Sequence, residues 1–532
     1  MAISSVWRRL AAVALVGAVA TTAGCAEGDA SAGSSLGLDS AAIAVNAVAD
    51  PGESGDGGVL TVAEYSEPGS LDPLDTVATG VSGGSALAAL YDVLVRYNAE
   101  SGEYEPWLAR DLVASEDFST WTLTLRPGVT FSDGTPLDAA AVVASVQRYL
   151  TGGSDAAVIS GSLESVDVVD PATVQFRLTH PWATFPHMLA MGAGMIVAPA
   201  ATAGDTFTPI GAGPFTFSEY RPGEKLRLTA RDDYWGGAPH VDGLEFVWIG
   251  SGTAALESLD NGNVDMATVR NVEQVRDGLA SGYEGYLEPV ALGSTMWINH
   301  RDGRPGADVR VREAIALAVD PSAVADRAYD GDTELAGKSI FHPESPWYTG
   351  VEPIAADPDA ARALLDQAAA DGYDRRLTLL VGTDPVAQQQ ALALQAQLQN
   401  VGFRVELDAD PSVTSRITKL YVKNAFDLAI GSSAVVASDP FHQLNDTVSS
   451  TAAYNLTGYA SPEMDAALVA LQEAPDDDAE RAALADIERL WNRDVVSVNL
   501  STAVNAEFWR DTVHGVVPAS DFMMLFGDVW KN

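Results

Sequence analysis

Residues 120–150, TWTLTLRPGVTFSDGTPLDAAAVVASVQRYL, contain the most informative pattern of the chain. Polar and apolar side chains alternate over the first six residues, as in a strand with one buried face. A turn follows at residues 126–128, and Thr135 is placed to cap a helix whose first residue is Pro136. Apolar side chains then recur at helical spacing as far as Tyr149. The stretch predicts a strand, a turn and a helix, and on its own it carries no chemistry.

The size and charge of the chain limit its possible functions. Its 532 residues are enough for two or three domains with sizeable cores. The net charge is −42, with five lysines and 26 arginines against 73 acidic residues. Electrostatic binding of nucleic acid or of an anionic membrane is therefore not expected. The acids are spread along the whole chain. This favours a role in solubility over a role in attracting cationic solutes.

Cysteine and histidine do not form a recognisable metal site. The single cysteine, Cys25, excludes an intramolecular disulfide and a cysteine cluster. No two of the seven histidines have the four-residue spacing of a helical zinc site. We therefore expect no metal and no cofactor. The sequence also shows no recognisable catalytic constellation, which argues against an enzyme.

The first 25 residues have the features of an export signal. Two arginines precede an apolar run at residues 10–20, which is too short to span a bilayer. The sequence TAGC at residues 22–25 resembles a bacterial lipobox, although Thr22 stands where leucine is usual. An ordinary cleavage site beside an incidental cysteine is the alternative. We expect residues 1–24 to be a signal peptide and Cys25 to carry a lipid that anchors the exported protein to the outer face of the cell membrane.

The remaining chain divides by composition and by pattern. Residues 25–58 are rich in alanine, glycine, serine and aspartate, which predicts a flexible tether with a reach on the order of 30 Å. From residue 59 to about residue 292 the pattern mixes hairpins with βα units. Strands and helices alternate over residues 377–432, which is typical of a doubly wound α/β unit.

Beside the stretch at residues 125–150, the chain contains six further motifs in a fixed order, which are SLDP (70–73), LYDVLVRY (90–97), PIGAGPFTF (209–217), DDYWGGAPHVDGLEF (232–246), DVRVREAIALAVD (308–320) and DPDAARALLDQA (357–368). Together these motifs resemble the family 5 extracellular solute-binding proteins, which are the peptide- and nickel-type binding components of ABC importers. Mild departures stand at Ala212, Phe215 and Ile298, where the family usually has Thr, Tyr and Phe.

This resemblance implies an α/β fold of the two-lobed periplasmic-binding-protein type (type II, cluster C), with an extra subdomain inserted in lobe I. Lobe I would comprise residues 59–292 and 506–532, with the insertion at about 97–207, and lobe II would comprise residues 293–505. Closure about a hinge would trap a small solute between the lobes. The implied partners are that solute, ABC permease and ATPase subunits, and the membrane through the lipid anchor. We expect a monomer that does not bind nucleic acid.

Ligand contacts are expected where strands end at the cleft. Tyr65 and Ser66 end the first strand of the folded part, and Trp297 and Asn299 lie in the strand that opens lobe II. Core packing is the alternative role for Trp297. The loop SSAVVASDPFHQLND at residues 432–446 supplies the remaining candidates, which are Val436, Asp439 and Phe441.

This loop bears on the nature of the ligand. In peptide-binding members of the family, an aspartate three residues before a final Asp/Glu-Pro pairs with the amino terminus of the peptide. Here Asp439 and Pro440 match that pair, and Val436 occupies the position of the aspartate. Because valine cannot pair with an ammonium group, either Asp439 or another acid substitutes, or the ligand has no free α-amine there.

Three functions remain open. The first is a lipid-anchored binding component of an ABC importer, with an oligopeptide as the main ligand class. An oligosaccharide or a nickel or other metal chelate is the alternative ligand. The second function is a solute-sensing lipoprotein, and the third is a secreted hydrolase, which the missing catalytic residues disfavour. Tryptophans that would stack on a sugar are Trp182, Trp297 and Trp347, and histidines that would meet a chelate are His300 and His442.

Overall fold

The computed structural model describes residue 36 and residues 43–46, 54–98, 101–204, 206–452 and 455–532. All described helices and strands belong to the compact unit Gly37–Asn532, and Leu36 is the one described residue of the unit Met1–Leu36. The predicted signal peptide at residues 1–24, the lipidation at Cys25 and most of the predicted tether lie outside the described residues. No helix within the described ranges is both long enough and apolar enough to cross a membrane.

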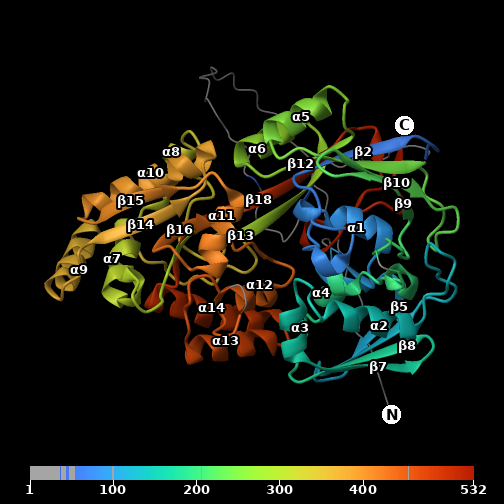
Figure 1. The fold of residues 1–532 in the computed structure, drawn as a ribbon, viewed down its shortest axis with the longest axis horizontal. Helices are drawn as coiled ribbons and strands as arrows, with labels where there is room; N and C mark the ends of the chain where they lie inside the picture. Colours follow the sequence, from blue (N-terminus) through green and yellow to red (C-terminus); the bar gives the residue numbers. More distant parts are fainter. Residues whose placement is uncertain (1–35, 37–42, 47–53, 99–100, 205, 453–454) are drawn as a thin grey trace, which may run out of the picture. The chain divides into compact units, whose positions relative to one another are not determined.

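A sheet of twelve strands runs through the unit Gly37–Asn532 (Figure 1). Its strands are β1 (Ile43–Val45), β2 (Val59–Glu64), β9 (Phe215–Arg221), β10 (Lys225–Ala230), β11 (Gly243–Trp248), β12 (Met266–Val269), β13 (Glu284–Ile298), β14 (Arg376–Val381), β15 (Arg404–Ala409), β16 (Leu428–Gly431), β17 (Val435–Val436) and β18 (Ser497–Trp509). Ten of them follow the order β15-β14-β16-β13-β18-β12-β2-β11-β10-β9, and both β1 and β17 pair with β13. The two longest strands, β13 and β18, therefore lie side by side in the middle of the sheet.

The two ends of the sheet differ in strand direction. β14 pairs in parallel with both β15 and β16, which confirms the doubly wound unit predicted for residues 377–432. At the other end β9, β10 and β11 are antiparallel neighbours, whereas β11 and β12 run parallel to β2. We call these two parts of the sheet the α/β half and the mixed half.

The strand pair β13–β18 has an irregularity near its middle. Its register shifts between Val290 and Ser294, and again before Thr295. Within this interval Leu292 adopts a positive φ of 54°, which is uncommon for a residue other than glycine. Gly293 lies so close to β18 that a Cβ atom would come within 2.3 Å of the Ala503 nitrogen. Glycine is required here because no side chain fits between the strands.

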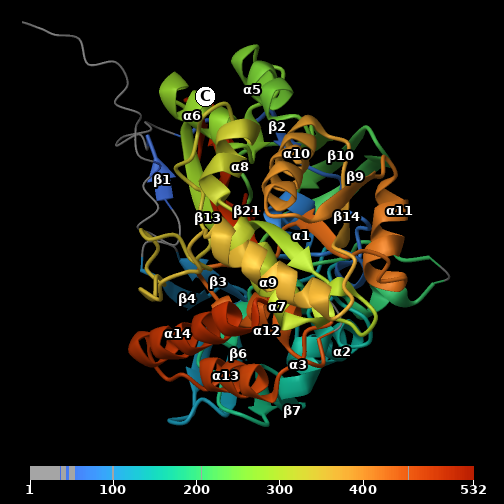
Figure 2. The ribbon, with the colours of Figure 1, turned by 90° about the vertical axis from the view of Figure 1, so that its left-hand side faces the viewer.

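Helices flank both halves of the sheet. The mixed half carries α1 (Gly84–Tyr91), α5 (Gly252–Asp260) and α6 (Val272–Ser281). The α/β half carries α7 (Val309–Ala318), α8 (Pro321–Ala328), α9 (Pro358–Ala370), α10 (Pro385–Asn400) and α11 (Val413–Ile417). Helix α11 continues into a π-helical turn at Thr418–Val422. Three further helices, α12 (Pro440–Val448), α13 (Pro462–Gln472) and α14 (Asp477–Asp494), follow β17, and we call them the helical cluster. α13 packs along α14, and α7 packs along α9 (Figure 2).

Residues 109–189 form a smaller unit that we call the four-stranded module. Its antiparallel sheet has the order β5-β6-β8-β7. The elements are β5 (Ala109–Ala114), β6 (Thr120–Leu125), α2 (Ala139–Tyr149), α3 (Ala156–Ser162), β7 (Leu163–Asp170), β8 (Thr173–Leu178) and α4 (Pro186–Leu189). Alternate residues of β6 are buried, which confirms the strand predicted from the TWTLTL sequence.

Several short elements complete the described chain. A hairpin of β3 (Val95–Asn98) and β4 (Glu103–Pro106) precedes the four-stranded module. Near the C-terminus, β19 (Val513–His514) pairs with β22 (Trp530–Lys531), and β20 (Val517–Pro518) pairs with β21 (Met524–Leu525). The described 3-10 turns are Pro73–Asp75, Gly80–Ser82, Gly192–Gly194, Pro199–Thr202, Pro305–Ala307 and Ser520–Phe522.

The start of α2 differs from the sequence-based prediction. The helix begins after Asp138, whose carboxylate accepts a hydrogen bond of 2.9 Å from the Ala141 amide. Thr135 does not cap it, because its hydroxyl and amide both donate to Asp133. Pro136 lies in an isolated β-bridge and not in the helix. The predicted cap was therefore wrong, since the turn itself holds the threonine and leaves the capping role to the aspartate.

The apolar cores show how the parts are connected. Separate cores lie under the mixed half and under the α/β half. A third core combines apolar residues of the four-stranded module with those of the helical cluster. In this core Trp182 packs edge to face on Phe441, with ring centroids 5.3 Å apart. The module and the helical cluster therefore bury apolar surface against each other.

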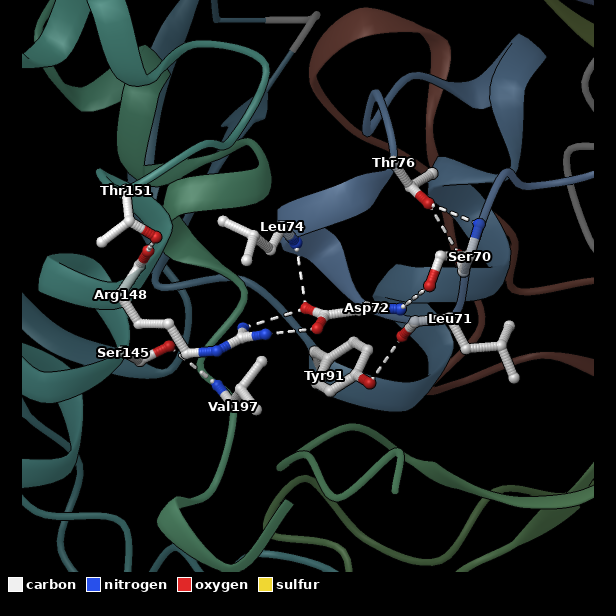
Figure 3. A network of polar contacts seen from close by, with 10 residues as sticks. All are labelled: Ser70, Leu71, Asp72, Leu74, Thr76, Tyr91, Ser145, Arg148, Thr151 and Val197. Carbon is white, nitrogen blue, oxygen red and sulfur yellow. Dashed lines mark hydrogen bonds and ion pairs between the residues drawn. The ribbon is translucent and has the colours of Figure 1, made fainter. Parts of the chain in front are cut away.

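A charged contact fastens the module to the mixed half (Figure 3). Asp72, from the SLDP motif, accepts hydrogen bonds from both terminal nitrogens of Arg148 near the end of α2. The same carboxylate caps the turn that follows it, through the Leu74 amide at 3.0 Å. Asp72 is buried, and nearby the Tyr91 hydroxyl donates to the Leu71 carbonyl at 2.7 Å. Two of the most recognisable motifs of the sequence thus meet in one ion pair.

We predict that Arg148→Ala lowers the free energy of unfolding by about 3 kcal/mol, because it leaves the buried Asp72 carboxylate without its partner. Urea unfolding followed by circular dichroism measures the loss. Arg177→Ala is the matched control, since Arg177 pairs with Asp167 on the exposed surface of the same module and is expected to cost less than about 1 kcal/mol. Equal losses in the two variants would contradict the prediction.

Candidate solute-binding site

A cavity of about 240 Å³ lies where the four-stranded module meets the helical cluster and the edge of the α/β half. α3 of the module packs against α12 of the cluster at this place (Figure 1). The walls include Asp155 from the module, Asp446 from α12, and Trp297 from β13. Ser433 and Tyr421 add a hydroxyl group and a second aromatic side chain. Residues far apart in the sequence therefore line one polar and aromatic pocket at a junction between parts of the molecule, which is a frequent location of a small-ligand site.

Trp297 is both a wall of the cavity and a packed side chain. Its indole Nε1–H donates to the Ser433 hydroxyl at 3.4 Å, and the ring belongs to a small apolar cluster with Phe426 and Leu456. A Cβ atom at Gly431 would lie 2.1 Å from the ring, so the indole lies directly over the backbone of β16. The binding and packing roles expected for Trp297 are compatible in this geometry.

Asn299 is placed differently from Trp297. Its side-chain amide is buried and donates to the carbonyls of Asn424 at 3.2 Å and Phe426 at 2.9 Å. Its oxygen accepts from the Arg301 amide at 3.2 Å. Asn299 does not line the cavity. The polar atoms of this side chain are thus used to hold the chain after β13.

Tyr65 and Ser66 follow β2 but do not line the cavity. The Tyr65 ring lies against the guanidinium group of Arg270, 5.0 Å from the ring centroid, in a cation–π contact. The Ser66 hydroxyl donates to the Val81 carbonyl at 2.7 Å. Both residues therefore make contacts within the mixed half.

Val436 and Phe441, from the loop predicted to meet the ligand, are buried on either side of Asp439. Val436 lies in β17 and pairs with Val290 of β13. Phe441 packs on Trp182, as described above. Trp182 is itself fully buried, so the prediction that it stacks on a sugar is wrong.

Asp439 lies in a buried group of titratable side chains. Its carboxylate accepts a hydrogen bond of 3.2 Å from the Thr184 hydroxyl of the module. Burial raises the pKa of Asp439, although His187 and His442 act in the opposite direction. His187 is 3.2 Å from Asp521, and its ring centroid is 5.8 Å from that of His442. Asp439 thus contributes to the contact between module and cluster.

His442 makes a buried charged contact between the module and the helical cluster. Its Nε2 atom is 3.1 Å from Asp155 and 3.8 Å from Asp446. Burial alone would lower the pKa of His442, but its pairing with Asp155, together with the charges of Asp446 and Asp439, raises the pKa to about 10. The ring is therefore charged at neutral pH.

The two acids beside His442 both line the cavity but differ in their surroundings. The pKa of Asp155 is lowered, against the opposing effect of burial, by His442 and by the Tyr149 hydroxyl, which donates at 2.7 Å. Burial raises the pKa of Asp446 to about 6, and His442 offsets only part of this effect. His442 therefore compensates the negative charge of Asp155 more fully than that of Asp446.

Sequence reasoning missed Asp155 and Asp446. Asp155 stands 287 positions before its partner His442, and no local spacing marks such a pair. The four-residue spacing of His442 and Asp446 was the available signal, because residues at this spacing share one face of a helix. His300 was the other histidine expected near a chelate. It donates from Nε2 to the Val496 carbonyl at 2.9 Å, and burial lowers its pKa to about 4.

A second, larger cavity of about 500 Å³ lies between the β3–β4 hairpin and the start of α14. Tyr97, Tyr104, Trp347 and Glu480 are among its walls. It shares no lining residue with the cavity beside Trp297. Within the described part of the chain, no group of three or more histidine, cysteine, aspartate or glutamate side chains is placed to hold a metal ion.

Solved structures share this architecture. The dipeptide binding protein from Pseudoalteromonas sp. SM9913, in complex with Met-Leu, matches with a TM-score of 0.75 and 20% identity over 89% of this chain and 100% of that chain. NikA from Brucella suis, in complex with Fe(III)-EDTA, matches with a TM-score of 0.73 and 24% identity over 89% and 100% of the two chains. The protein therefore has the predicted α/β periplasmic-binding-protein fold.

Sequence comparison identifies the family. Residues 103–455 match the family of bacterial extracellular solute-binding proteins, family 5 (middle region), and the chain belongs to this family. The probable D,D-dipeptide-binding periplasmic protein DdpA of Escherichia coli K12 is 26% identical over 401 residues, which cover 73% of this chain and 77% of that protein. The nickel-binding periplasmic protein of the same strain is 27% identical over 349 residues, covering 60% and 66%. The protein is thus an extracellular solute-binding component of an ABC importer and not an enzyme.

We predict that His442→Gln lowers the free energy of unfolding by about 3 kcal/mol near neutral pH, because Asp155 then remains buried without a cation. The contribution of His442 is present below its ordinary pKa of 6.5 and is lost as the pH rises through about 10. The difference between wild type and variant should therefore shrink across this range. Urea unfolding at a series of pH values measures it.

His180→Gln is the control for this prediction. His180 also contacts the helical cluster, at 3.1 Å from Glu473, but both side chains are exposed. A pair of this kind contributes less than about 1 kcal/mol. If wild type and His442→Gln lose stability in parallel as the pH rises, the histidine is not the charged group of the contact.

Proposed function

We propose that this protein is a lipid-anchored receptor that captures a small peptide in the cavity beside Trp297 and delivers it to the permease and ATPase subunits of an ABC importer. The observation that carries this proposal is the shared cavity, to which the four-stranded module contributes Asp155 and α12 contributes Asp446. A solute bound there contacts both parts at once. Its binding energy therefore favours the arrangement in which they are closed.

The proposed lobes follow from the same arrangement. We assign residues 59–292 and 506–532 to lobe I, with the insertion at about 97–207, and residues 293–505 to lobe II. The irregularity of β13 at Leu292 and Gly293 supports a hinge at this boundary, because the ladder is interrupted there. Bending at that point would open the cavity while the rest of each lobe stays rigid.

The polar groups of the cavity favour a ligand with an ammonium group. Val436 cannot provide a carboxylate, and Asp439 is buried against Thr184. Asp446 is the acid that we assign to the amino terminus of the peptide, because it lines the cavity and, among the described residues, is paired with His442 alone, at 3.8 Å. Among the described residues that line this cavity, none is lysine or arginine. Trp297 supplies the apolar wall for a side chain of the peptide.

We predict that short peptides with a free amino terminus stabilise the protein against heat, after unfolding and refolding to remove any carried solute. A ligand at about 100 times its Kd adds about 2.7 kcal/mol to the free energy of unfolding. Thermal-shift measurements with dipeptides and tripeptides, oligosaccharides and nickel chelates test this. Stabilisation by none of them, or hydrolysis of a peptide, would refute the proposed function. A response to sugars or chelates alone would replace the peptide with that ligand class.

Asp446→Asn sharpens this test. The affinity of this variant for the stabilising peptide should fall by about tenfold, because one charged hydrogen bond is lost. Amino-terminal acetylation of the peptide should cause a similar loss in the wild type and little further loss in the variant. Asp486→Asn is the matched control, because Asp486 lies exposed on α14 beside Arg489. An unchanged affinity in Asp446→Asn would assign the amine to another group.

We also predict that Cys25→Ala releases the protein from membranes into the medium, because the variant has no thiol to receive the lipid. Cell fractionation followed by immunoblotting measures the distribution. The first 24 residues are unchanged in this variant, so export itself should continue. If Cys25→Ala remains with the membrane fraction, the lipobox interpretation of residues 22–25 is wrong.

A further inference from the structure

The larger cavity contains a buried acid without a partner. Glu480 lies in the first turns of α14, is 9% exposed and lines the cavity. Among the described residues, none donates a hydrogen bond to its carboxylate or forms an ion pair with it, and the carboxylate oxygens reach the cavity. A buried carboxylate is costly unless a cation or hydrogen-bond donors compensate it. The side chain is therefore poised for a positively charged partner from outside the chain.

The charges around Glu480 do not compensate it. Burial raises the pKa of Glu480 to about 8, and the neighbouring acids Asp439 and Asp477 contribute to the rise. Arg481, which also lines the cavity, acts in the opposite direction, but its guanidinium group makes contacts of its own. Its guanidinium group contacts Asp478 at 3.3 Å and donates to the Pro346 carbonyl at 3.3 and 3.4 Å.

Aromatic side chains stand in the same cavity. Tyr97 and Tyr104 come from the β3–β4 hairpin, with ring centroids 5.2 Å apart. The Tyr104 hydroxyl donates to the Ser438 carbonyl at 3.0 Å, which fixes the ring. The Trp347 indole donates to the Ala437 carbonyl at 2.7 Å, and the Arg481 guanidinium carbon lies 5.7 Å from the centroid of the indole ring. Held aromatic rings beside an acid attract cations through their negative faces.

We propose that this cavity is a second binding site, which takes an organic cation whose ammonium or guanidinium group pairs with Glu480 beside Tyr97, Tyr104 and Trp347. The cavity has about twice the volume of the one beside Trp297, so it accommodates an organic group and not only the charged centre. The site goes beyond the proposed function, because the two cavities have no lining residue in common. The cation is either a free metabolite or the basic side chain of a larger transported solute.

Calorimetric titration of the full-length protein, in a maltoside detergent, tests this site with choline. Choline is permanently charged, and 3,3-dimethylbutan-1-ol is its neutral isostere. We expect choline to bind and the isostere not to bind. Because choline prefers the ionised form of Glu480, its affinity should rise by about tenfold or more between about pH 6.5 and about pH 9.

Glu480→Gln should reduce choline affinity by at least about tenfold and remove the pH dependence. This variant removes a buried acid whose ionisation is unfavourable, so its fold should be at least as stable as the wild type. Glu463→Gln, an exposed position on α13, is the matched control and should bind choline normally. The proposal is overturned if choline produces no heat, if the isostere binds equally well, or if Glu480→Gln binds choline like the wild type.

Competition distinguishes the two sources of the cation. Ala-Lys-Ala and Ala-Ala-Ala are each titrated into the choline-saturated protein. Displacement of choline by the lysine peptide alone assigns the site to a basic side chain of the transported solute. Choline binding that neither peptide affects assigns the site to a free organic cation. Choline binding does not require peptide binding, so failure of the proposed peptide function would leave this test decisive.

Discussion

The strand pair β13–β18 is the constraint on which the rest of the structure depends. These strands pair across the middle of the sheet, and backbone hydrogen bonds leave little freedom to either. The last residues of β18 pair with β12 in the mixed half, and the last residues of β13 pair with β16 in the α/β half. The two halves are therefore parts of one sheet. The irregularity at Leu292 and Gly293 is where this continuous ladder is interrupted, and we propose that relative movement of the halves is concentrated there.

A second constraint acts through the four-stranded module, in which one short segment contacts both the mixed half and the helical cluster. Arg148, near the end of α2, pairs with Asp72 of the mixed half. Seven residues later Asp155, just before α3, contacts His442 of the helical cluster. The Tyr149 hydroxyl, which donates to Asp155, ties the two contacts together. The stretch that reveals the family in the sequence thus ends in the segment, residues 148–155, through which both sides of the molecule are connected.

Local patterns predicted single elements and the α/β half, the family resemblance predicted the fold as a whole, and the candidate site was predicted only in part. The alternation of TWTLTL predicted β6, and the strand–helix repeat predicted the α/β half, because both signals lie within a few residues. Trp297 was the one predicted ligand contact that lines the smaller cavity. Asn299 looks identical to a ligand contact in the sequence, but its amide serves the backbone of Asn424 and Phe426. Asp155 and Glu480 were missed because their environments are assembled from distant segments, which no local spacing records.

The two cavities give part of the negative charge of the chain a more specific role than solubility. Spread along a surface, acidic side chains keep a protein soluble, and most of the 73 acids require no other explanation. Glu480 differs, because burying a carboxylate without a partner destabilises the empty protein. Replacing it with glutamine would remove this cost while keeping the shape. When a cation pairs with such a carboxylate, the unfavourable free energy of burying it is removed. The free energy recovered in this way makes binding of the cation more favourable. The same reasoning applies more weakly to Asp446, whose charge His442 partly compensates at 3.8 Å.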